Sequence, residues 1–279
     1  MKNVGVIGAG TMGQGIANAF ATAGYNVTVC DIKIEWAQNG INKIGAKLDK
    51  LVSREKITAE KAEGIKANLT AGEYKDLADC DLIVEAVLEK MEIKKDLFKT
   101  LDEICKEDCI FGTNTSSLSV TEIANGIKHN VIGMHFFNPV PAMKLVEVIA
   151  GGNTPAELVD YIKNLSTEIG KTPVVVNEAP GFVVNKILIP YCNEGVCVLQ
   201  EGVASAEDID IAMQLGCNHP MGPLHLGDLI GWDVVLNIMD VLFNETHDSK
   251  YRANVLIRKM VRAGKLGIKS GEGFFKYTK

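Results

Sequence analysis

The chain has 279 residues, is 47% hydrophobic and carries a formal net charge of −6. Its length suffices for one large domain or two smaller ones, whereas its negative charge argues against nucleic acid as the main partner. No apolar run reaches the roughly eighteen residues that a membrane helix needs, and the N-terminus lacks a signal-peptide pattern, so we expect no membrane partner.

The seven cysteines are scattered along the chain without a C-x-x-C pair. Cys105 and Cys109 would share a helix face, but two ligands make a poor metal site. We therefore expect reduced thiols in a cytoplasmic protein and no metal.

The first 31 residues have the pattern of a strand, a helix and a second strand. Val4 to Ala9 is a short β-branched run, and residues 26–31 form another. The segment between them has helical composition and ends at Gly24, which is a plausible helix stop. This arrangement has the length of a βαβ unit.

A G-x-G-x-x-G motif joins the first strand to the helix, and Asp31 closes the second strand. In this context the glycines permit a tight turn, close approach of the backbone to a pyrophosphate, and close packing of helix on strand. The helix N-terminus offers unpaired N–H groups to the phosphates. Asp31 would bond ribose hydroxyls and repel a 2′-phosphate, which favours NAD (or NADH) over NADP, although Lys33 leaves some use of NADPH open. The predicted cofactor-binding residues of this motif are Gly8, Gly10, Thr11, Met12, Gly13 and Asp31. The alternative is a Rossmann domain that no longer binds a nucleotide.

Residues 35–68 are charged and helical, which predicts a helical-hairpin insertion. Beyond it, strands and helices alternate. We predict strands at 81–87, 109–116, 130–137, 144–151 and 172–179, and helices at 91–105 and 155–169. The first of these strands is continuously apolar and suits a buried, parallel sheet.

After Pro180 the chain has helix signals and almost no strands. Ser205 begins a helix-start pattern, and residues 226–243 are expected to form one apolar helix. The predicted fold is α/β: residues 1–180 form a Rossmann-type, mostly parallel sheet with the hairpin insertion. Residues 181–279 form a smaller, all-α domain for substrate binding and dimerisation.

Polar residues follow three of the later strands: Glu85 and Glu89, then 114–117, then 135–138. A nucleotide bound at the switch point of such a sheet places its reactive end over the carboxyl ends of these strands. We therefore expect these three segments to converge on the nicotinamide.

His135 and Glu147 lie in two apolar segments separated by "NPVP". A lone histidine in an apolar strand is more often a satisfied core residue. Here the prolines force a turn and the chain returns, so that Glu147 can lie beside His135. A carboxylate on one imidazole nitrogen fixes the tautomer, and the pair would supply the proton that carbonyl reduction or alcohol oxidation requires.

Five motifs carry a family resemblance: "GAGTMGQGIA", "NTSSLS", "HFFNPVPAMKLVEVI", "PGFVVNKILIPY" and "GPLHLGDLIG". Together they resemble the 3-hydroxyacyl-CoA dehydrogenase family over essentially the whole chain, most closely its short, stand-alone bacterial members. The resemblance implies reversible hydride transfer between NAD and C3 of a short 3-hydroxyacyl-CoA. Acetoacetyl-CoA and (S)-3-hydroxybutyryl-CoA are the substrate pair expected.

The resemblance also implies roles for individual residues. His135 corresponds to the catalytic histidine of the family and Glu147 to its carboxylate partner. Ser116 corresponds to the serine that bonds the substrate carbonyl region near the cofactor. Asn185 corresponds to the asparagine that helps to hold the substrate.

Further positions correspond to cofactor and coenzyme A contacts. The resemblance places Glu89, Lys94 and Asn138 near the ribose and nicotinamide, and Lys269 at a C-terminal lysine linked with the cofactor. The helical hairpin corresponds to the part of the family that contacts coenzyme A, with Lys50 and Arg54 as candidate phosphate contacts. For these last two, a solvated helix face is an equal alternative.

Three other functions remain to be weighed. A dehydrogenase of free sugar acids would use a catalytic lysine, which "HFFNPVP" argues against. A crystallin-like structural role would leave the chemistry free to be lost, yet every proposed catalytic residue is present. A nucleotide-sensing module is the third.

The apolar helical segments and the family resemblance favour a homodimer or higher homo-oligomer.

Overall fold

The computed structural model describes residues 2–277, and the chain divides between Ala179 and Pro180 into two compact units. The boundary expected from the sequence, after residue 180, lies one residue away. In the described residues 2–277 no helix is long and apolar enough to cross a membrane.

The first unit is built on an eight-stranded sheet with the order β3-β2-β1-β4-β5-β6-β7-β8. Every neighbouring pair is parallel except β6 and β7. The strands are β1 (Asn3–Ile7), β2 (Asn26–Cys30), β3 (Leu69–Ala71), β4 (Leu82–Glu85), β5 (Ile110–Thr113), β6 (Val131–Phe136), β7 (Leu145–Ala150) and β8 (Thr172–Asn177). The predicted mostly parallel sheet is confirmed, whereas the short edge strand β3 had no periodic signal in the sequence.

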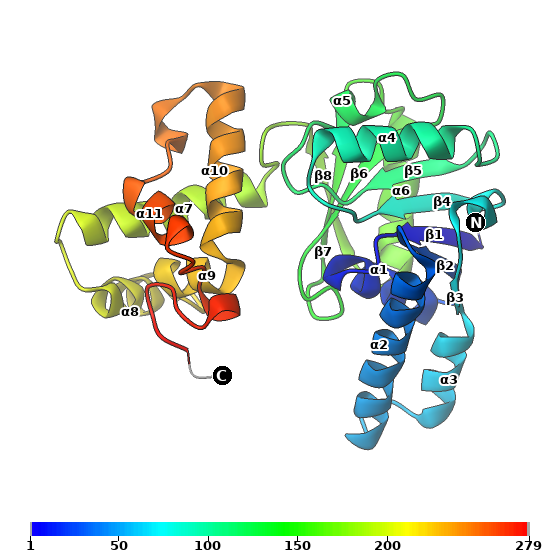
Figure 1. Ribbon diagram of the computed structural model, residues 1–279, viewed down its shortest axis with the longest axis horizontal. Helices are drawn as coiled ribbons and strands as arrows, with labels where there is room; N and C mark the ends of the chain where they lie inside the picture. Colours follow the sequence, from blue (N-terminus) through cyan, green and yellow to red (C-terminus); the bar gives the residue numbers. More distant parts are fainter. Residues whose placement is uncertain (1, 278–279) are drawn as a thin grey trace. The chain divides into compact units, whose positions relative to one another are not determined.

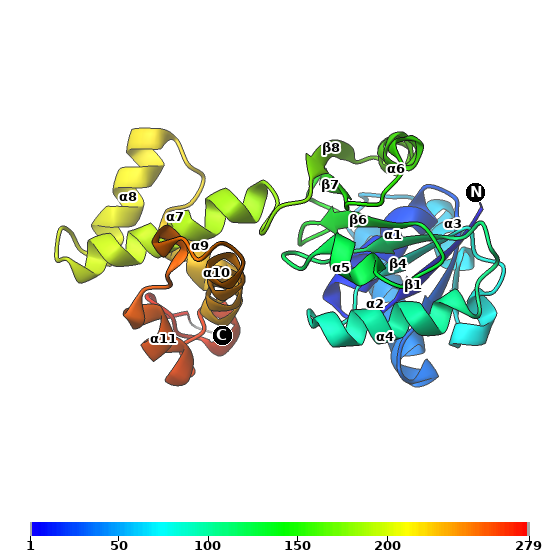
Figure 2. The ribbon, with the colours of Figure 1, turned by 90° about the horizontal axis from the view of Figure 1, so that it is seen from above.

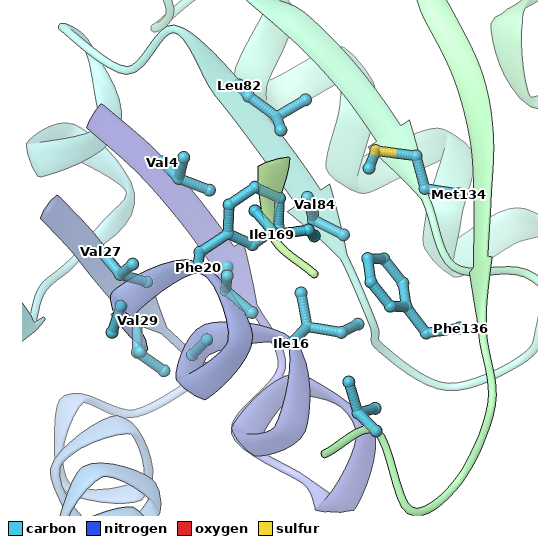
Figure 3. Close-up of a cluster of buried hydrophobic side chains, with 14 of the residues drawn as sticks. Val4, Ile16, Phe20, Val27, Val29, Leu82, Val84, Met134, Phe136 and Ile169 are labelled. Carbon is cyan, nitrogen blue, oxygen red and sulfur yellow. The ribbon is translucent and has the colours of Figure 1, made fainter. Parts of the chain in front are cut away.

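Helices cover both faces of this sheet (Figures 1 and 2). On one face lie α1 (Thr11–Thr22) and α6 (Ala156–Glu168), and on the other lie α4 (Met91–Asp102) and the short α5 (Val120–Ala124), which the sequence did not predict. Figure 3 shows Ile16 and Phe20 of α1 packed against β-branched side chains of the central strands. All of these side chains are removed from water, so the hydrophobic effect fixes α1 and the loop before it on the sheet.

The predicted hairpin is confirmed as α2 (Ile34–Ser53) and α3 (Ala59–Ala67), and it projects from the sheet in Figure 1. Thr58 caps α3 by accepting the backbone N–H of Lys61 at 3.2 Å. A short 3₁₀ turn, η1 (Tyr74–Leu77), leads from β3 towards β4.

The second unit is helical. It contains α7 (Val184–Gln200), α8 (Ala206–Cys217), α9 (Pro223–Ile230), α10 (Trp232–Thr246), η2 (Ser249–Tyr251), α11 (Val255–Arg262) and η3 (Ile268–Ser270). Ser205 caps α8 as predicted, accepting the N–H of Asp208 at 3.1 Å. The single helix expected over 226–243 is wrong: Gly231, at φ +101°, separates α9 from α10 with a conformation that an L side chain rarely adopts.

Asp228 is the buried polar centre of this second unit. It is 0% exposed, and its two oxygens accept the indole N–H of Trp232, the backbone N–H groups of Phe274 and Phe275, and the hydroxyl of Tyr277. Since a buried carboxylate is costly unless its oxygens are hydrogen-bonded, these four donors tie the C-terminal segment to α9 and α10.

Candidate active site

The glycine-rich loop lies where the strand order of the sheet reverses, because β1 has β2 on one side and β4 on the other. Gly8 has φ +99°, and a Cβ there would lie 2.4 Å from the carbonyl oxygen of Ala86, just after β4. A Cβ on Gly13 would lie 1.7 Å from the oxygen of Gly8. A Cβ on Gly10, by contrast, would meet no atom within 4 Å. The fold thus requires glycine at positions 8 and 13. At Gly10 the fold has room for a side chain, so the absence of one there leaves space for a bound molecule.

The N-terminus of α1 has features that suit an anion. Gly10 occupies the N-cap position, no side chain caps the helix, and no acidic residue lies in its first turn. Asp31 stands beside the loop, with one oxygen 2.7 Å from the N–H of Ala9 and the other 2.7 Å from that of Ile32. A helix dipole with open donors next to a fixed carboxylate suits a pyrophosphate and an adjoining ribose.

His135 and Glu147 face each other across the only antiparallel pair in the described sheet. Their Cα atoms are register partners, and Nδ1 of His135 lies 2.7 Å from Oε2 of Glu147. The histidine is 6% exposed and the glutamate 0%. The ring of Phe137 lies 4.4 Å from the imidazole, centroid to centroid. His135 and Glu147 therefore lie within hydrogen-bonding distance, as the predicted pair requires, and water is largely excluded from their surroundings.

Two side chains from other segments, Lys171 and Asn114, hold the turn between β6 and β7 in place. Lys171 is buried and donates through Nζ to the carbonyl oxygens of Val140 and Met143, the latter at 3.0 Å. Burial lowers the pKa of this lysine. Asn114 accepts the N–H of Phe136 at 2.8 Å and so joins the end of β5 to the end of β6. The turn is therefore fixed at both ends.

A cavity of about 120 Å³ lies between this turn, α1 and the hairpin helix α2. Asn138 and Val140 form one wall, and Gln14 and Lys47, 3.1 Å apart between Oε1 and Nζ, form another. The side-chain oxygen of Asn18, which also lines the cavity, is buried without a hydrogen-bond partner. Such an oxygen would accept an N–H group from a molecule in the cavity.

Ser116 belongs to a loop after β5 that is organised by Glu89. One oxygen of Glu89 accepts the N–H of Ser116 at 2.7 Å, its hydroxyl at 3.0 Å and the hydroxyl of Thr115 at 2.6 Å. The other oxygen lies 3.2 Å from Nζ of Lys94. Burial alone would raise the pKa of Glu89, but the Lys94 ammonium and the Thr115 and Ser116 donors outweigh it, so the pKa is lowered.

The remaining predicted residues are placed separately. Lys50 and Arg54 are exposed at the C-terminal end of α2. In the second unit, Asn185 is buried in the first turn of α7, and Nζ of Lys269 lies 2.5 Å from Asp233.

Reasoning from the sequence missed four residues of this region, Gln14, Asn18, Lys47 and Lys171. Gln14 and Asn18 share the face of α1 one turn apart, which the helical period could have indicated. Lys171 follows the turn it binds by some thirty positions in sequence. Only the tertiary fold brings them together.

Comparison with known proteins identifies the family of this chain. Residues 3–179 match the family model described as 3-hydroxyacyl-CoA dehydrogenase, NAD binding domain, and residues 181–277 match that of its C-terminal domain. The chain is 56% identical to 3-hydroxybutyryl-CoA dehydrogenase of Clostridioides difficile, over 98% of this chain and 99% of the relative. It is 45% identical to a probable 3-hydroxybutyryl-CoA dehydrogenase of Bacillus subtilis, over 99% and 98%. The crystal structure of (S)-3-hydroxybutyryl-CoA dehydrogenase from Ralstonia eutropha matches with a TM-score of 0.96, at 45% identity over all of both chains.

The contrast between Gly10 and Gly13 yields a first prediction. Gly10→Ala should unfold at the wild-type temperature, because its methyl group meets open space, yet should weaken NADH binding about tenfold by obstructing the phosphates. Gly13→Ala should lower the thermal unfolding midpoint, because its methyl group collides with the backbone of Gly8. Differential scanning fluorimetry and NADH fluorescence titration measure the two effects. Gly64→Ala on α3, another position with open space, is the control. Unchanged NADH affinity in Gly10→Ala would contradict a phosphate site here.

Proposed function

Because the chain belongs to the 3-hydroxyacyl-CoA dehydrogenase family and is thus an oxidoreductase with an NAD-binding domain, we propose that it interconverts acetoacetyl-CoA and (S)-3-hydroxybutyryl-CoA. The observation that carries the proposal is the cross-strand hydrogen bond of His135 with Glu147, at 2.7 Å. The high identity to relatives named 3-hydroxybutyryl-CoA dehydrogenase supports the short acyl chain.

In this proposal His135 moves the proton. When bound, NADH supplies a hydride for C3 of the ketone. The bond of Nδ1 to Glu147 assigns proton exchange to Nε2, which in the protonated ring donates to the oxygen that develops negative charge at C3. The buried carboxylate of Glu147 stabilises the imidazolium and fixes the ring orientation, and the reverse reaction uses the neutral ring as a base. Ser116 is proposed to bind the carbonyl region of the substrate, and the family resemblance supports Asn185 as a further substrate-binding residue.

We also propose that the cofactor is NAD rather than NADP. The carboxylate of Asp31 stands at the end of β2 beside the phosphate loop, where a 2′-phosphate would meet its negative charge. Steady-state oxidation of NADH and of NADPH, with acetoacetyl-CoA and with longer 3-ketoacyl-CoAs, measures cofactor choice, activity and chain length together. A protein that bound NADH without turning over any of these thioesters would be a structural or nucleotide-sensing member of the family instead.

The catalytic pair gives a second prediction. His135→Gln should lower kcat by about 10²–10⁴-fold, the usual contribution of a positioned acid–base group, while the Kd for NADH stays near that of the wild type. Glu147→Gln should also lower kcat, because a neutral amide no longer stabilises the imidazolium. His247→Gln, a surface histidine of the second unit, is the control. Near-normal turnover in His135→Gln would refute the assignment of the acid–base group.

The hairpin is proposed to bind the coenzyme A part of the substrate. The 120 Å³ cavity adjoins α2, and the exposed cations Lys50 and Arg54 lie further along the same helix. The unpartnered oxygen of Asn18 in that cavity fits an amide N–H such as those of a pantetheine arm.

A third prediction concerns these cations. Lys50→Ala/Arg54→Ala should raise KM for acetoacetyl-CoA about tenfold, since charge-assisted phosphate bonds are lost, with kcat unchanged. Lys259→Ala/Arg262→Ala, an exposed lysine and arginine on α11, is the matched control. If KM does not rise, both residues belong to a solvated helix face.

We further propose that the protein is a homodimer joined through the helical unit. A groove of about 320 Å³ between α7 and α8 has an almost entirely apolar lining, which includes Tyr191, Ile209, Met213 and the 68% exposed Val203. Exposed apolar surface of this kind is typical of protein interfaces.

A cytoplasmic location stays a prediction from the reduced cysteines, which fractionation of the source cells would check.

A fourth prediction tests this interface. Val203→Glu should convert the dimer to a monomer in size-exclusion chromatography with light scattering, because a buried carboxylate without a partner is costly. Val255→Glu, at a 59% exposed valine on α11 outside the groove, should remain dimeric. A dimer of unchanged affinity in Val203→Glu would move the interface elsewhere.

A further inference from the structure

Glu85, the last residue of β4, is a buried carboxylate to which the mechanism gives no task. It is 0% exposed. Its Oε1 accepts Nζ of Lys94 at 2.6 Å and the N–H of Val87 at 2.7 Å, and its Oε2 accepts the hydroxyl of Thr113 at 2.7 Å. Lys94 and Thr113 are buried and Val87 is half-buried, so all partners of Glu85 described here are groups of the protein itself.

Lys94 connects Glu85 to the surface of the site. It is 1% exposed in the first turns of α4, and its ammonium group lies 2.6 Å from Glu85 and 3.2 Å from Glu89. Glu85, Lys94 and Glu89 thus form a line of three charged side chains, and Glu89, whose side chain is 34% exposed, is its solvent-exposed end. The other oxygen of Glu89 holds the loop of Ser116.

The charges in this line are −1, +1 and −1. A buried ammonium group is costly without compensation, and two carboxylates compensate Lys94 here while one negative charge remains in excess. The excess charge falls on Glu89, where hydroxyl and backbone donors of residues 115–117 bind it. Glu85 therefore decides how much of the charge of Glu89 is available to that loop.

We propose that Glu85 is a positioning residue of the cofactor site, which acts through Lys94 to keep Glu89 oriented towards the Ser116 loop. The proposal rests on the proposed function only in taking Glu89 and Ser116 to bind the nicotinamide half of the cofactor. Without the charge of Glu85, Lys94 has Glu89 as its sole counter-ion and draws it away from the loop. The loop then loses the acceptor that orders it.

The experiment is a double-mutant cycle on the full-length protein. Glu85→Gln should weaken NADH binding about tenfold in fluorescence titration and raise KM for NADH. Since Glu85 acts through Lys94, Glu85→Gln/Lys94→Met should bind NADH no more weakly than Lys94→Met alone. Loss of packing by itself would lower the unfolding temperature but leave the NADH affinity of the folded protein unchanged.

Two further variants complete the test. Glu92→Gln, an exposed carboxylate on the same helix, should bind NADH as the wild type does. Thr113→Val keeps all three charges and removes a hydroxyl that donates to Glu85 at 2.7 Å and accepts the N–H of Thr115 more weakly, at 3.3 Å; it should weaken NADH binding about threefold. This variant decides the matter if Glu85→Gln does not fold.

Three results would overturn the proposal: folded Glu85→Gln with NADH affinity within about twofold of wild type, multiplicative effects in the cycle, or wild-type affinity in Thr113→Val. Failure of the proposed function is a separate result. A wild-type protein that binds NADH but does not reduce acetoacetyl-CoA would refute the substrate, while the NADH titrations would still decide the role of Glu85.

Discussion

The pairing of β6 with β7 is the constraint on which the candidate site depends. These strands run antiparallel in a sheet that is otherwise parallel, and their register places His135 directly opposite Glu147. Because strand side chains alternate between faces, a shift of one residue would put the two groups on opposite sides of the sheet. Register in turn depends on the turn between the strands, which Lys171 and the bond of Asn114 to Phe136 hold.

The rest of the site follows from the parallel strands. Their carboxyl ends meet at one edge, so the glycine loop after β1, Glu89 after β4 and Ser116 after β5 are brought to the same region from distant parts of the chain. Helix α1 then presents its N-terminus to that edge because its apolar side chains are buried on the sheet (Figure 3). The positions of these candidate groups are thus a consequence of core packing.

Buried charge has a consistent place in this molecule. Glu85 and Lys94, Glu147 and Asp228 are all almost completely buried, and each binds specific partners. Because an unpaired charge in such surroundings would be very costly, each group fixes the geometry of its neighbours. In Asp228 the result is structural, since it holds the C-terminal segment in place. In Glu147 and Glu85 it is the orientation of groups that face the proposed ligands.

The sequence by itself determined the fold class, the glycine-rich loop and the candidate pair, because each depends on local signals. Strand and helix periods, glycine spacing and a turn between two strands act over a few residues, and the family motifs add the residue roles. Predictions that needed longer range were less complete. The sequence around Gly231 resembles one continuous helix because the neighbouring residues are apolar, so the break there was missed. Strand β3 is too short to show a period. Lys171 binds a turn some thirty residues earlier in the chain, and Glu85 and Glu89 bind Thr113 and Ser116, which follow them by 28 and 27 residues. Only tertiary packing decides such contacts, since a charge is buried where the whole fold supplies its partners.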